Sequence, residues 1–185
     1  MFMRFDLTPT GMAGTRATRW MAIRWLLLMA CLVLQGCSTA PTRKEALQLK
    51  LQIETSGRLN SDEQGRAAPV VVRVYELKSA AAFDNADFFT LQNEDRKVLA
   101  ADLLAVDEFI MRPGTDERIE RKSNPATTAI GVLVGYRELG KSVWRATWRL
   151  PEAPDAAWYR AVVPDRTVAL KIEARDQAVS ITEVN

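Results

Sequence analysis

The clearest pattern in the chain is an alternation of apolar and polar residues, which predicts β-strands. Between residues 45 and 54, leucine and isoleucine alternate with polar residues, as in a half-buried strand. The run VVVRVYEL at residues 70–77 is apolar on both faces except at Arg73 and Glu76. That pattern is typical of a central strand covered on both sides.

Further short strands are predicted in the second half of the chain. They span residues 107–112, 116–121, 127–137, 142–150 and 168–174, with a last strand ending around Val184. The charged alternation at 116–121 favours an edge strand. Gly131 and Gly135 lie on one face of their strand, where another group can approach the backbone closely.

Residues 78–105 interrupt this pattern with a stretch rich in Ala, Leu and Phe. Possible N-caps at Ser79, Asn85 and Asp95 predict two or three short helices. Their apolar residues are expected to pack on the sheet: Phe83, Phe88, Phe89, Leu91, Leu99 and Leu103. Eight short strands with one helical insert predict a mainly β fold, an antiparallel two-sheet β-sandwich. A barrel would give the same pattern and is the main alternative.

The first 36 residues have a different character and are predicted to be a signal peptide. Arginines precede an unbroken apolar run at 25–34, which is too short to span a bilayer permanently. Leu34-Gln35-Gly36-Cys37 then looks like a bacterial lipobox, in which cleavage before the cysteine precedes its lipidation. We therefore expect residues 1–36 to be removed, residues 37–44 to be the lipidated Cys37 and a tether, and residues 45–185 to fold.

Composition changes once this leader is removed. The whole chain has 25 basic and 23 acidic residues, but four arginines and only one aspartate lie before Cys37, so the mature part has a net charge of −1. This balance gives no argument for nucleic-acid binding. The chain has no histidine, which excludes Ser-His-Asp and Cys-His catalysis and zinc sites that contain histidine. Beyond the covalent lipid on Cys37 we expect no cofactor, metal, small-molecule substrate or enzymatic activity.

Arg73 is a single cation in an apolar strand and needs a partner. We expect a structural ion pair with Asp87 or Asp102 in the helical insert. Asp87 and Asp102 could also form the paired-carboxylate active site of a hydrolase that lacks histidine. The sequence around them shows no signature of a catalytic pocket.

Two tryptophans support an alternative function. Trp144 and Trp148 share the apolar face of the strand at 142–150, which predicts that they lie in the core, with Arg145 and Arg149 on a solvated or edge face. If the rings were exposed instead, they would suit a carbohydrate- or peptidoglycan-binding module.

The polar loop at 56–69 separates the first two predicted strands. Loops on rigid strands commonly carry binding residues, so Asn60, Asp62 and Arg66 are candidates for partner contact. Gly65 and Pro69 have a sufficient explanation in shaping the backbone. Arg66 is also a candidate for an internal ion pair.

Several blocks in this order, behind a lipobox, resemble the TssJ (SciN) family of type VI secretion lipoproteins. The blocks are Leu59-Asn60 with Gly65-Arg66 and Pro69; residues 72–77; Phe83 with residues 86–89 and Leu91; Leu99 with residues 101–103; Pro113-Gly114; residues 130–132 with Tyr136-Arg137; and Trp144-Arg145.

The resemblance implies a fold, a location and a partner. The fold is a transthyretin-like β-sandwich with a small helical addition. Ser38, rather than Asp, follows the cysteine, which implies delivery to the outer membrane, facing the periplasm. The partner is the periplasmic C-terminal domain of the inner-membrane protein TssM, in a complex completed by TssL. The implied contact is the loop at 56–69, through Leu59, Asn60, Asp62, Gly65, Arg66 and Pro69.

Overall fold

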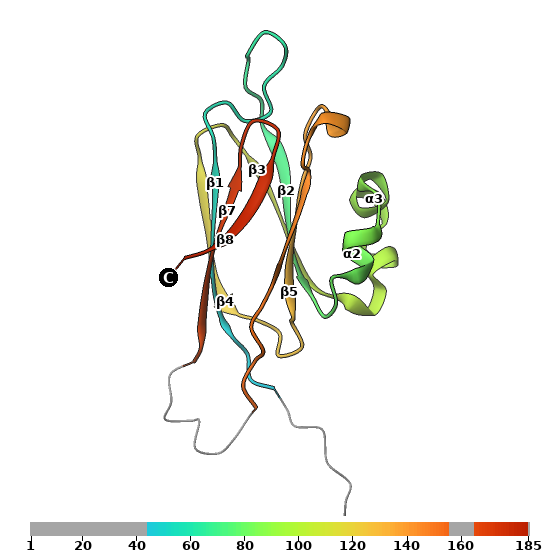
Figure 1. Ribbon diagram of the computed structural model, residues 1–185, viewed down its shortest axis with the longest axis vertical. Helices are drawn as coiled ribbons and strands as arrows, with labels where there is room; N and C mark the ends of the chain where they lie inside the picture. Colours follow the sequence, from blue (N-terminus) through green and yellow to red (C-terminus); the bar gives the residue numbers. More distant parts are fainter. Residues whose placement is uncertain (1–43, 156–164, 185) are drawn as a thin grey trace, which may run out of the picture. The chain divides into compact units, whose positions relative to one another are not determined.

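A computed structural model describes residues 44–155 and 165–184, which form two sheets and a helical layer (Figure 1). The predicted signal peptide, Cys37 and the tether up to residue 43 lie outside the described residues, as does part of the connection after residue 155. No helix in the described ranges is long and apolar enough to cross a membrane.

Sheet one has the strand order β4-β1-β7-β8. Its strands are β1 (Gln48–Thr55), β4 (Asp116–Lys122), β7 (Thr167–Ala174) and β8 (Val179–Glu183). β4 lies at an edge, as its charge pattern predicted. The pair β1–β7 is parallel, with Leu51 opposite Leu170. The predicted antiparallel sandwich is confirmed with this one parallel exception, which arises because β7 returns beside β1 through a long crossover connection.

Sheet two has the order β3-β2-β5-β6, with every pair antiparallel. Its strands are β2 (Val70–Leu77), β3 (Leu103–Met111), β5 (Ala129–Val134) and β6 (Arg145–Arg149). A short 3-10 turn, η2 (Leu139–Lys141), connects β5 to β6. The two separate sheets confirm the sandwich and remove the barrel alternative. The core between them contains alternate residues of β1 and β2, such as Leu51 and Val72.

A helical layer covers the outer face of sheet two. It consists of α2 (Ala81–Asn85), α3 (Phe88–Leu99) and the 3-10 turn η1 (Ala100–Asp102). The insert therefore ends at Asp102, not at residue 105, because β3 begins four residues before the predicted start of its strand. A second core, between the helices and sheet two, contains Tyr75, Leu77, Phe83, Phe88, Leu91 and Leu99. Phe89 was expected there but is 64% exposed.

At Gly131 on β5 the helical layer approaches the sheet closely. A Cβ at this position would lie 2.9 Å from Cε1 of Phe83 and 3.1 Å from Cδ1 of Leu77. The ring of Phe83 is fully buried and lies 5.3 Å from the ring of Tyr75, centroid to centroid. The close approach predicted for this glycine is therefore made by the protein's own helix α2.

We expect Gly131→Ala to lower the free energy of unfolding by about 1–3 kcal/mol, because the added methyl group overpacks a filled core. Chemical denaturation would measure this loss. Gly135→Ala is the matched control, because its added Cβ would meet its nearest neighbours at 3.7 Å, an ordinary contact. Equal stability of the Gly131→Ala protein and the wild type would contradict the close packing described here.

Candidate partner-binding site

Four connections meet at one end of the sandwich, which we call the loop end. They are residues 56–69 between β1 and β2, 112–115 between β3 and β4, 135–142 between β5 and β6, and 175–178 between β7 and β8. Hydrogen bonds join them: Gly114 N–H donates to the carbonyl of Ser56, and Ser56 N–H donates to the carbonyl of Ala174. β1 runs to this end from the opposite one, so about 25 Å of strand separates the loop end from Lys44. Figure 1 shows the loop 56–69 projecting beyond the sheets.

Leu59 and Asn60 fix the base of loop 56–69. Leu59 is fully buried in the core between the sheets. Asn60 has a positive φ of 51°, and its Oδ1 accepts a hydrogen bond from Arg137 N–H at 2.8 Å. Its Nδ2 donates to the carbonyl of Pro69 across the base of the loop. Both residues were predicted to contact a partner directly, but their side chains face inward and support the loop instead.

A single carboxylate, that of Asp62, organises the tip of the loop. Its Oδ1 accepts from the N–H groups of Gln64 and Arg66, at 3.0 and 2.9 Å. Its Oδ2 accepts from Nε of Arg66 at 2.7 Å. These donors hold the pKa of Asp62 below its ordinary value, chiefly through the backbone N–H and the guanidinium of Arg66. Gly65 completes the turn with a φ of +76°. Arg66 therefore has the internal ion pair that the sequence allowed.

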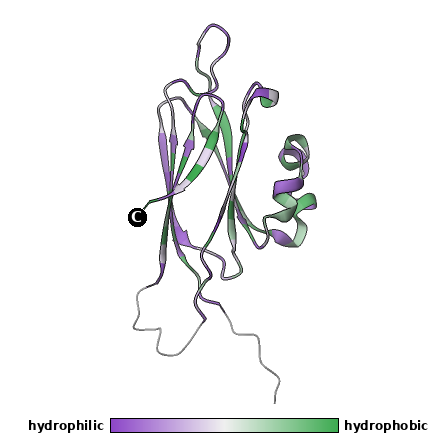
Figure 2. Ribbon diagram, in the orientation of Figure 1, coloured by the Kyte–Doolittle hydropathy of each residue, from purple (hydrophilic) through white to green (hydrophobic). Residues whose placement is uncertain are grey.

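The tip, residues 63–67, is exposed, and Figure 2 colours this loop as mostly hydrophilic. Of the predicted contact residues, Gly65 and Arg66 belong to this exposed tip, and Pro69 is exposed beside it. Hydrogen bonds within the tip restrain its shape. Binding a partner would therefore lose little conformational entropy, which favours a recognition role.

Arg73 is not paired with Asp87 or Asp102, so that prediction is wrong. Its Nε donates to Oε2 of Glu108 at 2.6 Å, and its Nη1 donates to the carbonyl of Gln92 at 2.7 Å. Glu108 is its neighbour across the β2–β3 ladder. Arg73 thus joins α3 to sheet two.

The two predicted partners of Arg73 have other positions. Asp87 is the N-cap of α3 and accepts from Thr90 N–H at 3.0 Å. Asp102 lies in η1, where its backbone carbonyl accepts from Lys78 N–H. The capping of α3 gives Asp87 a structural explanation and removes the motivation for a catalytic carboxylate pair.

A buried network around Glu76 was missed by the sequence analysis. Glu76 is only 2% exposed, and its Oε1 accepts from Nε of Arg121 at 2.8 Å. Its Oε2 accepts from Thr127 Oγ1 and from Asn124 N–H. Arg121 also forms an ion pair with Asp107 at 2.7 Å. Both oxygens of Glu76 are satisfied internally, and the network joins the two sheets.

Trp144 and Trp148 do not form an exposed aromatic platform. Both are partly buried and pack against the core between the sheets. The ring of Trp144 also meets that of Phe88 edge-on, with centroids 5.4 Å apart. Arg145 was expected on a solvated or edge face, and β6 is an edge strand of sheet two. Nη1 of Arg145 donates to the carbonyls of Phe83 and Ala86, both at 2.8 Å, so its guanidinium contacts α2 and is not simply solvated. The strand therefore serves to attach α2.

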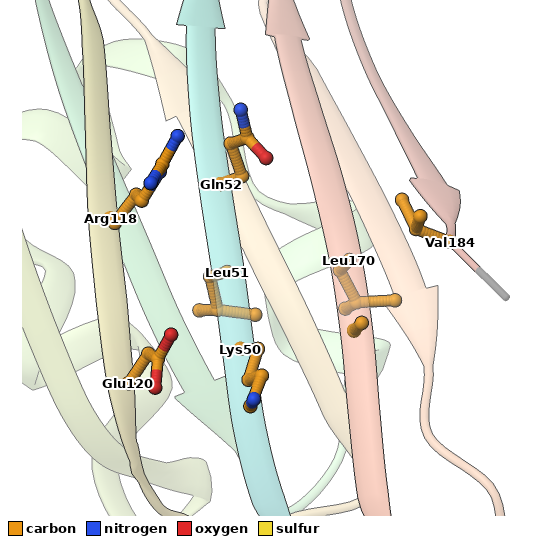
Figure 3. Close-up of a pocket in the computed structure, with 8 residues that line it drawn as sticks. Lys50, Leu51, Gln52, Arg118, Glu120, Leu170 and Val184 are labelled. Atoms are coloured by element: carbon orange, nitrogen blue, oxygen red, sulfur yellow. The ribbon is translucent and has the colours of Figure 1, made fainter.

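The outer face of sheet one carries a shallow hollow of about 360 Å³ (Figure 3). Its lining includes two cations, Lys50 and Arg118, one anion, Glu120, and the amide of Gln52. It is open, and it collects no set of catalytic groups. Within the described part of the chain, no group of three or more acidic or cysteine side chains could hold a metal ion.

Acid should loosen the loop tip only at low pH. The pKa of Asp62 in the folded loop is below its ordinary value of 3.8. Its stabilising contribution is therefore fully present above about pH 4 and is lost as the pH falls through the lower, folded value. Amide NMR signals of Gln64 and Arg66 should stay unchanged from neutral pH down to about pH 4 and shift below it. In Asp62→Ala these amides should lack that transition. A transition near neutral pH in the wild type would contradict the assignment.

Comparison with known proteins agrees with this geometry. The model of a family described as "Type VI secretion lipoprotein, VasD, EvfM, TssJ" matches residues 47–177. No curated protein sequence matches the chain significantly.

Several solved structures are similar to the chain. The crystal structure of the T6SS lipoprotein TssJ1 from Pseudomonas aeruginosa is 32% identical, covers 76% of this chain and 98% of its own, and has a TM-score of 0.66. Serratia marcescens Lip, a membrane-bound component of the type VI secretion system, is 29% identical over 74% of this chain and 97% of its own, with a TM-score of 0.63. A chain of the structure titled "T6SS protein TssM C-terminal domain" from EAEC shares the fold, at 22% identity over 75% of this chain and 98% of its own, with a TM-score of 0.51.

The family match covers the described sandwich from β1 to the turn after β7, including loop 56–69 and the helical layer. The chain belongs to the TssJ (SciN) family of type VI secretion lipoproteins.

Proposed function

We propose that this chain is a non-catalytic docking subunit of a type VI secretion system. In this proposal, lipid on Cys37 anchors it in the outer membrane, facing the periplasm. The exposed tip of loop 56–69 binds the periplasmic C-terminal domain of TssM, in the complex that TssL completes.

The observation that carries this proposal is the position of loop 56–69 together with the hydrogen bonds that hold its shape. The loop lies at the far end of β1 from Lys44, where the predicted tether ends. The tether would therefore join the domain at the end opposite the loop. The hydrogen bonds of Asp62 give the tip a fixed shape, which suits a protein partner.

The relatives support the same partner. One matched chain comes from a structure whose title names the TssM C-terminal domain. Lip from Serratia marcescens is titled a membrane-bound component of the secretion system. The carbohydrate-binding alternative loses its support, since Trp144 and Trp148 pack against the core. The hydrolase alternative would need Asp87 and Asp102 as its catalytic carboxylates, but Asp87 caps helix α3 and Asp102 lies in the turn η1.

Removing the tip should abolish partner binding without unfolding the domain. We expect deletion of residues 63–66 to weaken binding of the TssM C-terminal domain by at least about tenfold, because the deleted residues form the exposed contact. Leu59 and Asn60 remain, so the melting temperature should change little. Calorimetry on the purified chain would measure both quantities. The double variant Arg118→Ala/Glu120→Ala, on the outer face of sheet one, is the control and should bind normally. Undiminished binding after the deletion would remove the loop assignment.

Cys37→Ser should release the protein from the membrane. A serine cannot form the thioether that carries the lipid, so the variant should move from the outer-membrane fraction to the soluble or inner-membrane fraction. Secretion through the system should fail with it. Fractionation of cells that express the wild type, Cys37→Ser or Cys31→Ser would test this, since Cys31 lies in the predicted leader and should be replaceable. A Cys37→Ser protein that stays in the outer membrane would refute the anchor.

A further inference from the structure

The loop end exposes an unusual number of cations. Its four connections contain six basic and four acidic residues, whereas the mature chain as a whole has a net charge of −1. Five of the six cations are arginines: Arg58, Arg66, Arg112, Arg137 and Arg175. The side chains of Arg58 and Arg66 are 81% and 76% exposed. The loop end therefore has a net charge of +2, and the rest of the mature chain has a net charge of −3.

Two of the four acids at this end, Asp62 and Asp176, pair with the arginines and position them. Asp62, whose side chain is 11% exposed, pairs with Arg66 at 2.7 Å and with Arg137 at 3.6 Å. Asp176 lies 3.6 Å from Nη2 of Arg58 and also accepts from Ser61 N–H. The Asp62 carboxylate thus pairs with two guanidinium groups, and the side chains of Arg58 and Arg66 remain mostly exposed.

Two further arginines extend this surface across the other connections. Nη2 of Arg175 contacts Glu173, a residue of β7, at 2.6 Å. Arg112 is exposed, and no ion pair holds it within the described residues. A guanidinium has five N–H donors, and one internal carboxylate occupies only part of that set. Donors therefore remain available for external acceptors.

We propose that the loop end recognises an acidic surface, a cluster of aspartate and glutamate side chains on its protein partner. This inference rests on the proposed function and adds the chemistry of recognition to it. Planar guanidinium groups bind carboxylates in a bidentate way, and arginine is preferred over lysine where such geometry matters. Complementary charge would also speed the encounter of the two proteins in the periplasm.

An anionic lipid surface would offer similar charges, but the position of the cluster favours a protein. The loop end and Lys44 lie at opposite ends of β1. The chain leads from Lys44 back toward Cys37, so the anchored domain would present its arginines away from its own membrane.

The test compares charge reversals at the two ends of the domain. Arg58→Glu/Arg112→Glu changes two exposed arginines that make no contact with the Asp62 carboxylate. The matched control, Arg149→Glu/Arg166→Glu, makes the same charge change at exposed positions away from the loop end. Binding of each full chain, in mild detergent, to the TssM C-terminal domain is measured at low and high salt. Circular dichroism verifies the fold of each variant.

We expect the loop-end reversal to raise Kd at least about tenfold at low salt and the control to leave Kd within about twofold. Raising the ionic strength should weaken binding of the wild type and reduce the difference in Kd between the wild type and the loop-end variant, because salt screens exposed charges.

Binding that neither the loop-end reversal nor added salt weakens would overturn the acidic-surface inference and leave the proposed function intact. Arginine-dependent binding to phosphatidylglycerol vesicles, without an arginine effect on the protein partner, would also overturn it. If the wild type does not bind the domain at all, the proposed function fails and this inference fails with it.

Discussion

The rest of the structure depends on sheet two being buried on both of its faces. Every residue of β5 is buried, and so are six of the eight residues of β2. One face needs sheet one, and the other needs the helical layer, so neither partner is optional. At Gly131 the layers pack closely, with Phe83 occupying the space of a side chain. The helical layer is therefore an integral part of the packed core.

This rigid stack gives the loop end its fixed geometry. Strands of both sheets end together there, and their connections share hydrogen bonds through Ser56, Asn60 and Asp176. Loop 56–69 can therefore project and still keep one conformation. The polar groups that face inward at this end maintain the shape of the loop, and the groups that face outward remain available to a partner.

Local patterns predicted much of the fold, because alternation and turn residues act over short distances. The strands at 45–54 and 70–77, the charged edge strand and the helical insert all follow from them. The partner of Arg73 could not be predicted, since it depends on the β2–β3 register that places Glu108 opposite. The parallel β1–β7 pair likewise depends on a long crossover. In the candidate site, Leu59 is an apolar residue within a polar loop, a pattern that indicates burial. The family resemblance instead implied that Leu59 contacts the partner. Glu76, a single carboxylate in an apolar strand, was the corresponding signal for the buried network.

The strand β1 also has a mechanical consequence. It is hydrogen-bonded along both edges, to β4 and β7, over nearly its whole length. If the chain is held before Lys44 and pulled at loop 56–69, the load runs parallel to β1. The ladder bonds on both sides are then loaded in shear and must break together, instead of opening one after another from an end. The domain should therefore resist extension along this axis more than along any direction that peels an edge strand from its sheet.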